Sequence, residues 1–325
     1  MKKILVTGAR RSGTTFSGRA LSLHPSVSYL NEPFNWQFGI EGLVKEPSYL
    51  YIDKNVASNE HLLLLDDFFS LRRAQYRYYP EGTDLTPLLP RISNIFRNYS
   101  REKFHMRIFR VLQKNRGQFE FNKAKLLHSK NHLLVKDPLA ALASEFLAER
   151  YGLKVVVVIR HPAAFFLSMK NKGWGYDSES FTKQEDLRER FPEIFDENFL
   201  KARGIDDYII NEWIGVYAVL FDYVKTYPET FLPVRHIDIS LNPVETFKNM
   251  YHWLDLPYTQ RIENRIIKLT STSNKIEPTK MIDLTRNSSQ LPFLWKEKLT
   301  SSEIAKIRKR TESLASQYFP AESWE

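Results

Sequence analysis

The feature that most constrains this chain is the stretch at residues 2–16, KKILVTGARRSGTTF. Residues 4–6 are a short apolar run of strand-forming side chains, Gly8 interrupts it, and a helical pattern begins at Thr14. A buried parallel strand, a glycine-containing turn and a helix N-terminus bind anions together, because free backbone N–H groups and the positive end of the helix dipole converge there. The stretch therefore predicts an α/β fold with an anion site near its start.

The loop in this stretch differs from a nucleoside-triphosphate loop at the position that matters most. The spacing of its two glycines in GARRSG fits such a loop, but Thr14-Thr15 stands where a Lys-Ser/Thr pair is expected. The ammonium that normally holds the β- and γ-phosphates is therefore missing. A cation comes earlier instead, at Arg11, with Arg10 beside it.

The segment RRSGTTF resembles the 5′-phosphosulfate loop of sulfotransferases that use 3′-phosphoadenosine 5′-phosphosulfate (PAPS). That loop has Lys or Arg, then Ser-Gly-Thr/Ser-Thr/Ser, then an aromatic residue or Leu. The arginine version resembles bacterial and carbohydrate sulfotransferases. The resemblance implies that Arg11 also stabilises charge on the departing phosphate. It implies this set of contacts to the 5′-phosphosulfate: Arg10, Arg11, Ser12, Gly13, Thr14 and Thr15.

The next segment, HPSVSYLNEPF, extends the resemblance without a gap, because the family has a strand and then a Glu-Pro pair at this distance. The resemblance implies that Glu32 is the general base for the acceptor hydroxyl. A purely structural alternative is a carboxylate at the strand end that pairs with Arg10 or Arg11. His24 and His161 are alternative bases, although each stands beside a proline.

Residues 132–136 form a predicted third strand that ends in Lys136-Asp137-Pro138, which resembles a motif of bacterial sulfotransferases. The resemblance implies that Lys136 faces the transferred sulfuryl group or the acceptor and that Asp137 orients it. The alternative is a salt bridge at the end of a strand.

The second anion-binding element follows residues 154–159, a run that is apolar throughout and therefore predicts a fully buried parallel strand. Arg160 ends this strand, and Ser168 follows eight residues later on a predicted helix. A guanidinium at a strand end forms fork-shaped, charge-assisted bonds to phosphate. In PAPS-dependent sulfotransferases an Arg and a Ser with this spacing hold the 3′-phosphate, which implies that role here. The alternatives are an ion pair for Arg160 and no function for Ser168.

A late loop supplies two further candidates, because in the family it closes over the cofactor. Arg286 and Ser288 are expected to contact the 3′-phosphate or the sugar. Thr300 and Glu303 predict a capping box at the start of the last helix. The remaining predicted elements are strands at residues 27–30 and 231–238 and helices at residues 140–151, 207–224 and 242–254.

Together the pattern predicts one domain over residues 1–325 with a three-layer α/β/α architecture, a central parallel sheet and a P-loop NTPase-like order of elements. Residues 36–130 are expected to form a mostly helical insertion that shapes the acceptor site. Without cysteine, disulfides and thiolate metal sites are excluded, and no bound metal is expected. The sequence shows neither a signal peptide nor a transmembrane run, so a cytoplasmic location is predicted.

The net charge of +9 indicates an anionic partner. Residues 91–130 carry eleven Lys/Arg and two Glu, which fits an acidic substrate, an anionic cofactor or peripheral contact with a membrane surface. The alternative is a solvated helix face. No nucleic-acid partner is expected, because the sequence contains no recognisable nucleic-acid-binding motif.

The predicted function is sulfuryl transfer from PAPS to the hydroxyl of a carbohydrate or glycolipid, with adenosine 3′,5′-bisphosphate as product. One alternative is an ATP-dependent small-molecule kinase, against which Thr14 at the lysine position argues. The other is a non-catalytic module on the same fold that binds glycans or lipids.

Overall fold

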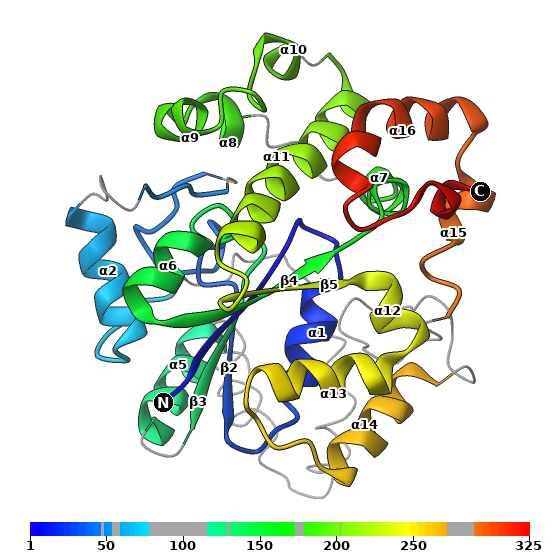
Figure 1. Ribbon diagram of the computed structural model, residues 1–325. Helices are drawn as coiled ribbons and strands as arrows, with labels where there is room; N and C mark the ends of the chain where they lie inside the picture. Colours follow the sequence, from blue (N-terminus) through cyan, green and yellow to red (C-terminus); the bar gives the residue numbers. More distant parts are fainter. Residues whose placement is uncertain are drawn as a thin grey trace, which may run out of the picture.

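Five parallel strands form the centre of the computed structural model, which describes residues 1–46, 49–53, 59–77, 116–128, 131–172, 179–201, 203–271 and 289–325. Their order across the sheet is β2-β3-β1-β4-β5 (Figure 1), so the first strand lies in the middle. The strands are β1 (Lys3–Thr7), β2 (Val27–Asn31), β3 (His132–Lys136), β4 (Leu153–Ile159) and β5 (Phe231–Arg235).

Helices cover both faces of this sheet, which confirms the predicted three-layer α/β/α architecture. One face packs on α1, α13 and α14, and the other packs on α6, α7, α11 and α16. The described helices are α1 (Thr14–Leu21), α2 (Asn59–Phe69), α5 (Arg116–Leu127), α6 (Ser144–Tyr151), α7 (Pro162–Lys170), α8 (Glu179–Thr182), α9 (Glu185–Arg190), α10 (Glu197–Leu200), α11 (Ile205–Thr226), α12 (His236–Leu241), α13 (Pro243–Trp253), α14 (Gln260–Thr270), α15 (Leu294–Lys298), α16 (Ser301–Ala315) and the 3₁₀ helix η2 (Ala321–Trp324). None of them has the length and hydropathy needed to cross a bilayer.

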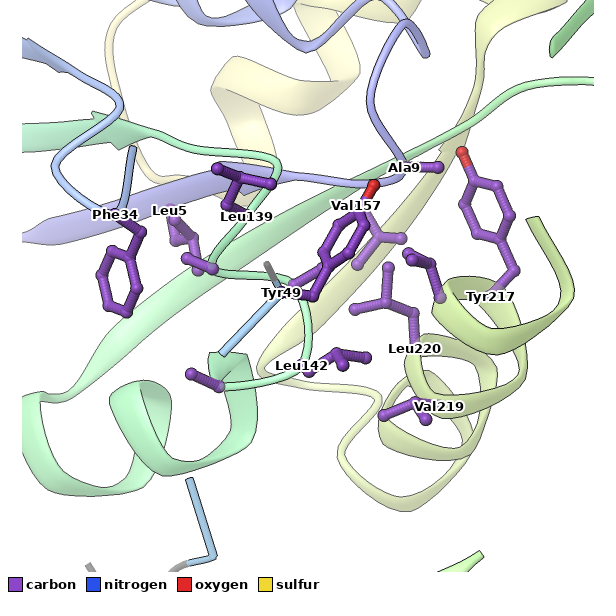
Figure 2. Close-up of a cluster of buried hydrophobic side chains, with 14 of the residues drawn as sticks. Leu5, Ala9, Phe34, Tyr49, Leu139, Leu142, Val157, Tyr217, Val219 and Leu220 are labelled. Atoms are coloured by element: carbon purple, nitrogen blue, oxygen red, sulfur yellow. The ribbon is translucent and has the colours of Figure 1, made fainter. Parts of the chain in front are cut away.

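The sheet is parallel because its central strands are apolar on both faces. Leu5 of β1 is in register with Val135 of β3 on one side and with Val155 of β4 on the other. On the face shown in Figure 2, Leu5 and Val157 of the sheet gather with side chains of α11 into one buried cluster. This packing fixes α11 directly behind the loop that follows β1.

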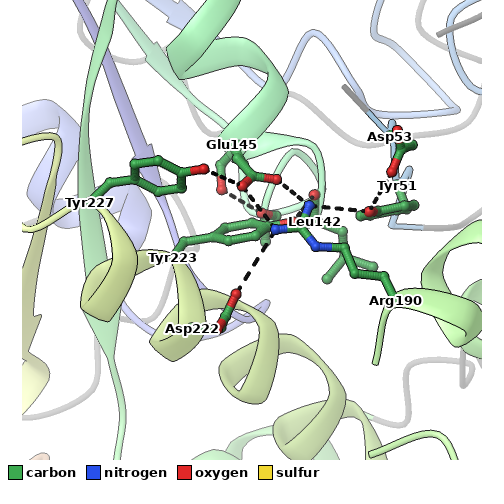
Figure 3. Close-up of polar contacts among 10 residues, drawn as sticks. Tyr51, Asp53, Leu142, Glu145, Arg190, Asp222, Tyr223 and Tyr227 are labelled. Carbon is green, nitrogen blue, oxygen red and sulfur yellow. Dashed lines mark hydrogen bonds and ion pairs between the residues drawn. The ribbon is translucent and has the colours of Figure 1, made fainter. Parts of the chain in front are cut away.

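A second buried cluster, polar in character, attaches the segment at residues 49–53 and helix α9 to the core (Figure 3). Glu145 of α6 forms an ion pair with Arg190 of α9 and accepts a 2.8 Å hydrogen bond from the hydroxyl of Tyr227. Arg190 also donates to the hydroxyl of Tyr51 at 3.3 Å. The buried carboxylate thus meets a cation and a hydroxyl, as a charge shielded from water requires.

Two predicted boundaries are wrong. The predicted strand at residues 231–238 ends at Arg235, and α12 begins at His236, because Arg235 and Asp238 close the first helical turn with bonds of 2.8 and 2.7 Å. The helix predicted from residue 140 begins only at Ser144. The residues before it form tight turns, in which the N–H of Ala141 donates to the carbonyl of Pro138 at 3.2 Å.

The predicted insertion at residues 36–130 is described only in part. Within those parts α2 and α5 are helical, whereas residues 36–46, 49–53 and 70–77 are largely irregular and include an antiparallel bridge between Ile40 and Tyr76. Residues 78–115 lie outside the described ranges.

Candidate functional site

The loop between β1 and α1 folds as a tight turn that requires glycine at two positions. Gly8 has φ of 144°, and a Cβ there would lie 2.3 Å from the carbonyl oxygen of Val158. Gly13 has φ of 95°, and a Cβ there would lie 2.7 Å from the ring of His236. Arg11 also has a positive φ, of 64°, which is an uncommon conformation for a residue other than glycine. The loop is therefore specified by close backbone contact with β4 and α12.

Arg11, Arg160 and Ser168 lie together at the carboxyl ends of β1 and β4. Nη1 of Arg160 donates to the carbonyl oxygen of Arg11 at 2.6 Å, and Nε of Arg11 donates to Oγ of Ser168 at 3.2 Å. The two strands are neighbours in the sheet, so the two predicted anion-binding elements face one region. Ligands of open α/β sheets bind at such carboxyl ends.

The side chain of Arg10 has a different environment from that of Arg11. Its guanidinium binds Glu212 of α11 through both carboxylate oxygens, at 2.8 and 2.5 Å. The hydroxyl of Tyr49 donates to the same carboxylate at 2.7 Å and accepts from the N–H of Arg10 at 3.0 Å. Glu212 is 2% exposed. Arg10, predicted to contact the cofactor, is thus committed to a buried ion pair behind the loop.

Ser12 is also turned away from solvent and is fully buried. Its Oγ lies 2.6 Å from the hydroxyl of Tyr217 on α11. Burial raises the pKa of Tyr217 to about 12, although the hydrogen bond with Ser12 works in the opposite direction. The side chain of Ser12 thus joins the loop to α11, while its backbone N–H, the group predicted to hold the 5′-phosphosulfate, donates to the carbonyl oxygen of Ala9 at 3.2 Å.

Thr14 and Thr15 are the first two residues of α1, and Gly13 precedes them. Thr14 is buried, whereas Thr15 is exposed. The first N–H groups of a helix have no partner within the helix, so this turn can donate to an anion as predicted.

Glu32 and Lys136 form an ion pair at the carboxyl ends of the neighbouring strands β2 and β3. The second carboxylate oxygen of Glu32 accepts from Nδ2 of Asn35 at 2.9 Å. The side chain of Lys136 is 1% exposed and that of Glu32 is 19% exposed. Although burial lowers the pKa of Lys136, the adjacent Glu32 carboxylate outweighs that effect, and the pKa lies above its usual value. The partner of Glu32 is therefore Lys136 rather than Arg10 or Arg11.

Asp137 is buried next to this pair, and its carboxylate accepts from the N–H groups of Phe34 at 2.6 Å and Leu139 at 2.9 Å. Burial, together with the nearby Glu32 carboxylate, raises the pKa of Asp137 to about 8. Asp137 thus fixes the backbone after β2 and after β3. It does not hydrogen-bond to Lys136, which it was predicted to orient.

The two alternative bases lie apart from the Glu32–Lys136 pair. His24 follows α1 near the amino ends of the strands, and its Nδ1 accepts from the N–H of Ser26 at 3.2 Å. His161 stacks on Trp295 with a 4.9 Å centroid separation and contacts Trp324 edge-on. Burial, with a smaller effect of Lys296, lowers the pKa of His161 to about 3. His24 thus lies at the opposite end of the strands from the loop, and His161 is enclosed by aromatic rings at the carboxyl end of β4.

A cavity of about 150 Å³ adjoins Arg160. Its walls combine aromatic rings, which would suit an aromatic molecule, with the cationic side chains of Arg160 and Lys296 and the carboxylate of Glu322. The main lining residues are Arg160, His161, His236, Phe293, Trp295 and Lys296. No sequence motif marked the last four, of which His236 begins α12 and the other three lie within residues 293–296.

Several predicted features lie outside the described residues. Arg286 and Ser288 belong to residues 272–288, and of the basic segment at residues 91–130 only residues 116–128 are described. Across the described ranges there is no cluster of three or more His, Asp or Glu side chains that could hold a metal ion. The expectation that the protein binds no metal stays a prediction.

The loop and the sheet both lie within a match to one known protein family. The model of the sulfotransferase family matches residues 3–260, which include β1 to β5 and the segments of Arg11, Glu32, Lys136 and Arg160. The chain belongs to the sulfotransferase family. This membership confirms the resemblance seen in RRSGTTF and sets aside the kinase alternative. A comparison with curated proteins gave no match.

Solved structures with a similar course of the chain are also sulfotransferases. The sulfotransferase domain of the curacin biosynthetic pathway is 14% identical, with 96% of this chain and 98% of that chain covered and a TM-score of 0.46. Sulfotransferase STF9 from Mycobacterium avium is 13% identical, and the match covers 98% of this chain and 76% of STF9, with a TM-score of 0.45. Mouse sulfotransferase SULT7A1, complexed with PAP, is 11% identical, and the match covers 96% of this chain and 85% of SULT7A1, with a TM-score of 0.39.

Proposed function

We propose that this sulfotransferase transfers a sulfuryl group from PAPS to the hydroxyl of a carbohydrate or glycolipid. The observation that carries the choice of donor is the junction of Arg11, Arg160 and Ser168 across β1 and β4. A donor with phosphate groups at both its 5′ and 3′ positions needs two cation sites at a fixed separation, and these strands supply them side by side. The cavity beside Arg160 offers aromatic walls for part of the nucleoside.

In this proposal Arg11 and the N–H groups at the start of α1 hold the 5′-phosphosulfate. The acceptor oxygen forms a new bond to sulfur while the bond from sulfur to the phosphate oxygen breaks. Negative charge then grows on the departing phosphate, and fixed donors such as Arg11 stabilise it. By analogy with phosphoryl transfer, positioning and charge stabilisation supply most of the catalysis.

The proton of the acceptor hydroxyl passes to Glu32, which keeps one fifth of its side chain open to solvent. Lys136 is too buried to leave its place, so it holds the carboxylate at the end of β2. Glu32 is therefore the proposed catalytic base, which is the role that the family resemblance implies. Lys136 is its buried ion-pair partner, which matches the alternative of a salt bridge at the strand end rather than a residue that faces the sulfuryl group or the acceptor.

The acceptor class rests on the arginine form of the loop and on the basic segment at residues 91–130. Peripheral contact with a membrane through that segment, and a cytoplasmic location, belong to the same proposal. We favour a glycan or glycolipid as the acceptor because this basic segment would attract an anionic sugar chain.

The test combines binding with transfer. Calorimetry should show that the protein binds adenosine 3′,5′-bisphosphate, whereas Mg-ATP should bind much more weakly. Mass spectrometry should then detect a sulfated product when PAPS is supplied with a panel of glycans and glycolipids. Tight nucleotide binding without transfer to any acceptor would favour the non-catalytic glycan- or lipid-binding alternative, and preferred binding of Mg-ATP would refute the donor.

A further inference from the structure

The hydroxyl of Tyr217, on the fourth turn of α11, meets groups from the loop and from β4. It lies 2.6 Å from Oγ of Ser12, 2.9 Å from the carbonyl oxygen of Val158 and 3.2 Å from the backbone nitrogen of Arg160. Its ring is fully buried. Figure 2 shows the phenol directed from α11 toward the turn at Ala9. One side chain thus contacts both predicted anion-binding elements from behind.

The direction of each hydrogen bond follows from the protons available. A phenol has one proton to donate and two lone pairs to accept with. The carbonyl oxygen of Val158 can only accept, so the proton of Tyr217 is used there. Ser12 and the N–H of Arg160 must then both donate to the phenol oxygen. The hydroxyl of Ser12 is consequently engaged with the protein and is not left to donate to a ligand.

The same helix holds these two elements at neighbouring positions. Glu212 binds the guanidinium of Arg10, and the indole nitrogen of Trp213 donates to the carbonyl oxygen of Arg160 at 2.9 Å. Tyr217 is one helical turn further along the same face. Of the contacts from α11, that of Tyr217 is shared between the loop and the end of β4, so it supports their spacing together with the direct bond from Arg160 to the carbonyl oxygen of Arg11.

We infer that Tyr217 is a positioning residue, which sets the distance between the 5′-phosphosulfate loop and the 3′-phosphate site by bonding to Ser12 and Arg160. This inference rests on the proposed function, since it assumes one donor that spans both elements. The phenol itself lies behind the loop and is not proposed to touch the donor. Its loss leaves a buried hydroxyl, an N–H and a carbonyl to find new partners, which loosens the spacing.

The experiment compares Tyr217→Phe with Tyr223→Phe. Tyr223 lies on the same helix, is equally buried, and donates to the carbonyl oxygen of Leu142 at 3.1 Å, far along α11 from the loop. Both variants lose one buried phenol hydroxyl, so both should lose thermal stability. Only Tyr217→Phe should bind adenosine 3′,5′-bisphosphate more weakly, by about tenfold in Kd, as expected for a lost hydrogen-bond partner.

A second readout separates positioning from general damage. Tyr217→Phe should raise KM for PAPS more than it lowers kcat, and its effect should not add to that of Ser12→Ala, because both remove the same contact. Should Tyr217→Phe fail to fold, Ser12→Ala, which removes the loop side of the contact, should still weaken binding of the bisphosphate, although by less, because the bond between Tyr217 and Arg160 remains. Equal affinities of wild type and Tyr217→Phe, or equal losses in the two tyrosine variants, would overturn the inference while leaving the proposed function in place. If wild type binds no bisphosphate, both are overturned.

Discussion

The adjacent side chains of Arg10 and Arg11 point to opposite sides of the loop between β1 and α1. Arg10 points to the buried Glu212, whereas Arg11, with its φ of 64°, directs its guanidinium toward Ser168. The carbonyl oxygen of Arg11 accepts from Arg160 at 2.6 Å, so the backbone at this positive φ is bonded to the end of β4. At the residue scale, then, Arg10 fixes the loop through Glu212, whereas Arg11 is the arginine that we propose for contact with the donor.

Replacement of Arg11 tests whether this residue contributes to catalysis. We expect Arg11→Ala to lower kcat/KM for sulfate transfer by about 10² to 10³, because a donor aimed at the developing charge is lost. Sulfate transfer measured with labelled PAPS gives the rate. Arg265→Ala, at an exposed position of α14, is the control and should retain wild-type activity. Unchanged turnover in Arg11→Ala would refute its assigned role.

His161 gives a prediction on pH and stability. Its pKa is about 3 in the folded protein, against an ordinary value near 6.5, because it is enclosed by aromatic rings. Between these two values the unfolded chain binds a proton that the folded chain excludes. The free energy of unfolding should therefore fall as the pH is lowered from about 6.5 toward 3, by at most about 1.4 kcal/mol per pH unit from this group.

Urea denaturation at a series of pH values measures this slope. Relative to His161→Gln, wild type should lose stability as the pH falls through that window. Parallel stability curves for wild type and His161→Gln would show that His161 is accessible to protons in the folded state.

At the scale of single elements, local patterns predicted most of the structure. The run at residues 154–159 identified β4 because it is apolar throughout, and its structure is a strand buried on both faces. The end of β5 was missed because no glycine or proline follows Val234 before residue 243 to mark the end of the strand. Only the contact between Arg235 and Asp238 shows that a helical turn begins there.

The candidate site was predictable only where its residues follow strand ends. Arg11, Glu32, Lys136 and Arg160 each stand just beyond or at the end of a strand, which a sequence reveals. The residues that hydrogen-bond to these four do not stand at strand ends, so the sequence pattern does not identify them. Tyr217, for example, contacts Ser12 across 205 positions of the sequence, and it stands in a helix whose apolar pattern marks it as an ordinary core residue.

The capping box of α16 is a predicted element that the structure confirms. Oγ1 of Thr300 accepts from the N–H of Glu303 at 3.2 Å, and the Glu303 carboxylate accepts from the N–H of Thr300 at 2.8 Å. We expect Thr300→Ala to lower the free energy of unfolding by about 1 kcal/mol. Chemical denaturation with unchanged m-values measures the loss. Ser301→Ala, one residue later and exposed, should cost less; equal losses would argue against the cap.

At the scale of the whole molecule, the position of β1 at the centre of the sheet organises the site. Its neighbours are β3, which ends at the Glu32–Lys136 pair, and β4, which ends at Arg160. The donor elements therefore lie on the β4 side of the loop, and the proposed base lies on the β3 side. Sulfuryl transfer from one side to the other would take place above the carboxyl end of β1.

This arrangement predicts that the protein distinguishes nucleotides by their 3′-phosphate, and Arg160 is the residue to change. Wild type should bind adenosine 3′,5′-bisphosphate about 10- to 100-fold more tightly than adenosine 5′-monophosphate, since charge-assisted bonds to one phosphate are gained. In Arg160→Ala this ratio should fall toward one, and in Ser168→Ala it should fall less, because a hydroxyl carries no charge.

Calorimetric titration of both nucleotides into each variant gives the ratio directly. The ratio is the decisive quantity because Arg160 also binds the carbonyl oxygen of Arg11, so its loss should weaken both nucleotides to some extent. If affinity for the two nucleotides falls equally, Arg160 acts only on the loop, and the 3′-phosphate must be held elsewhere. A ratio that collapses while the monophosphate still binds would place the second phosphate at the end of β4.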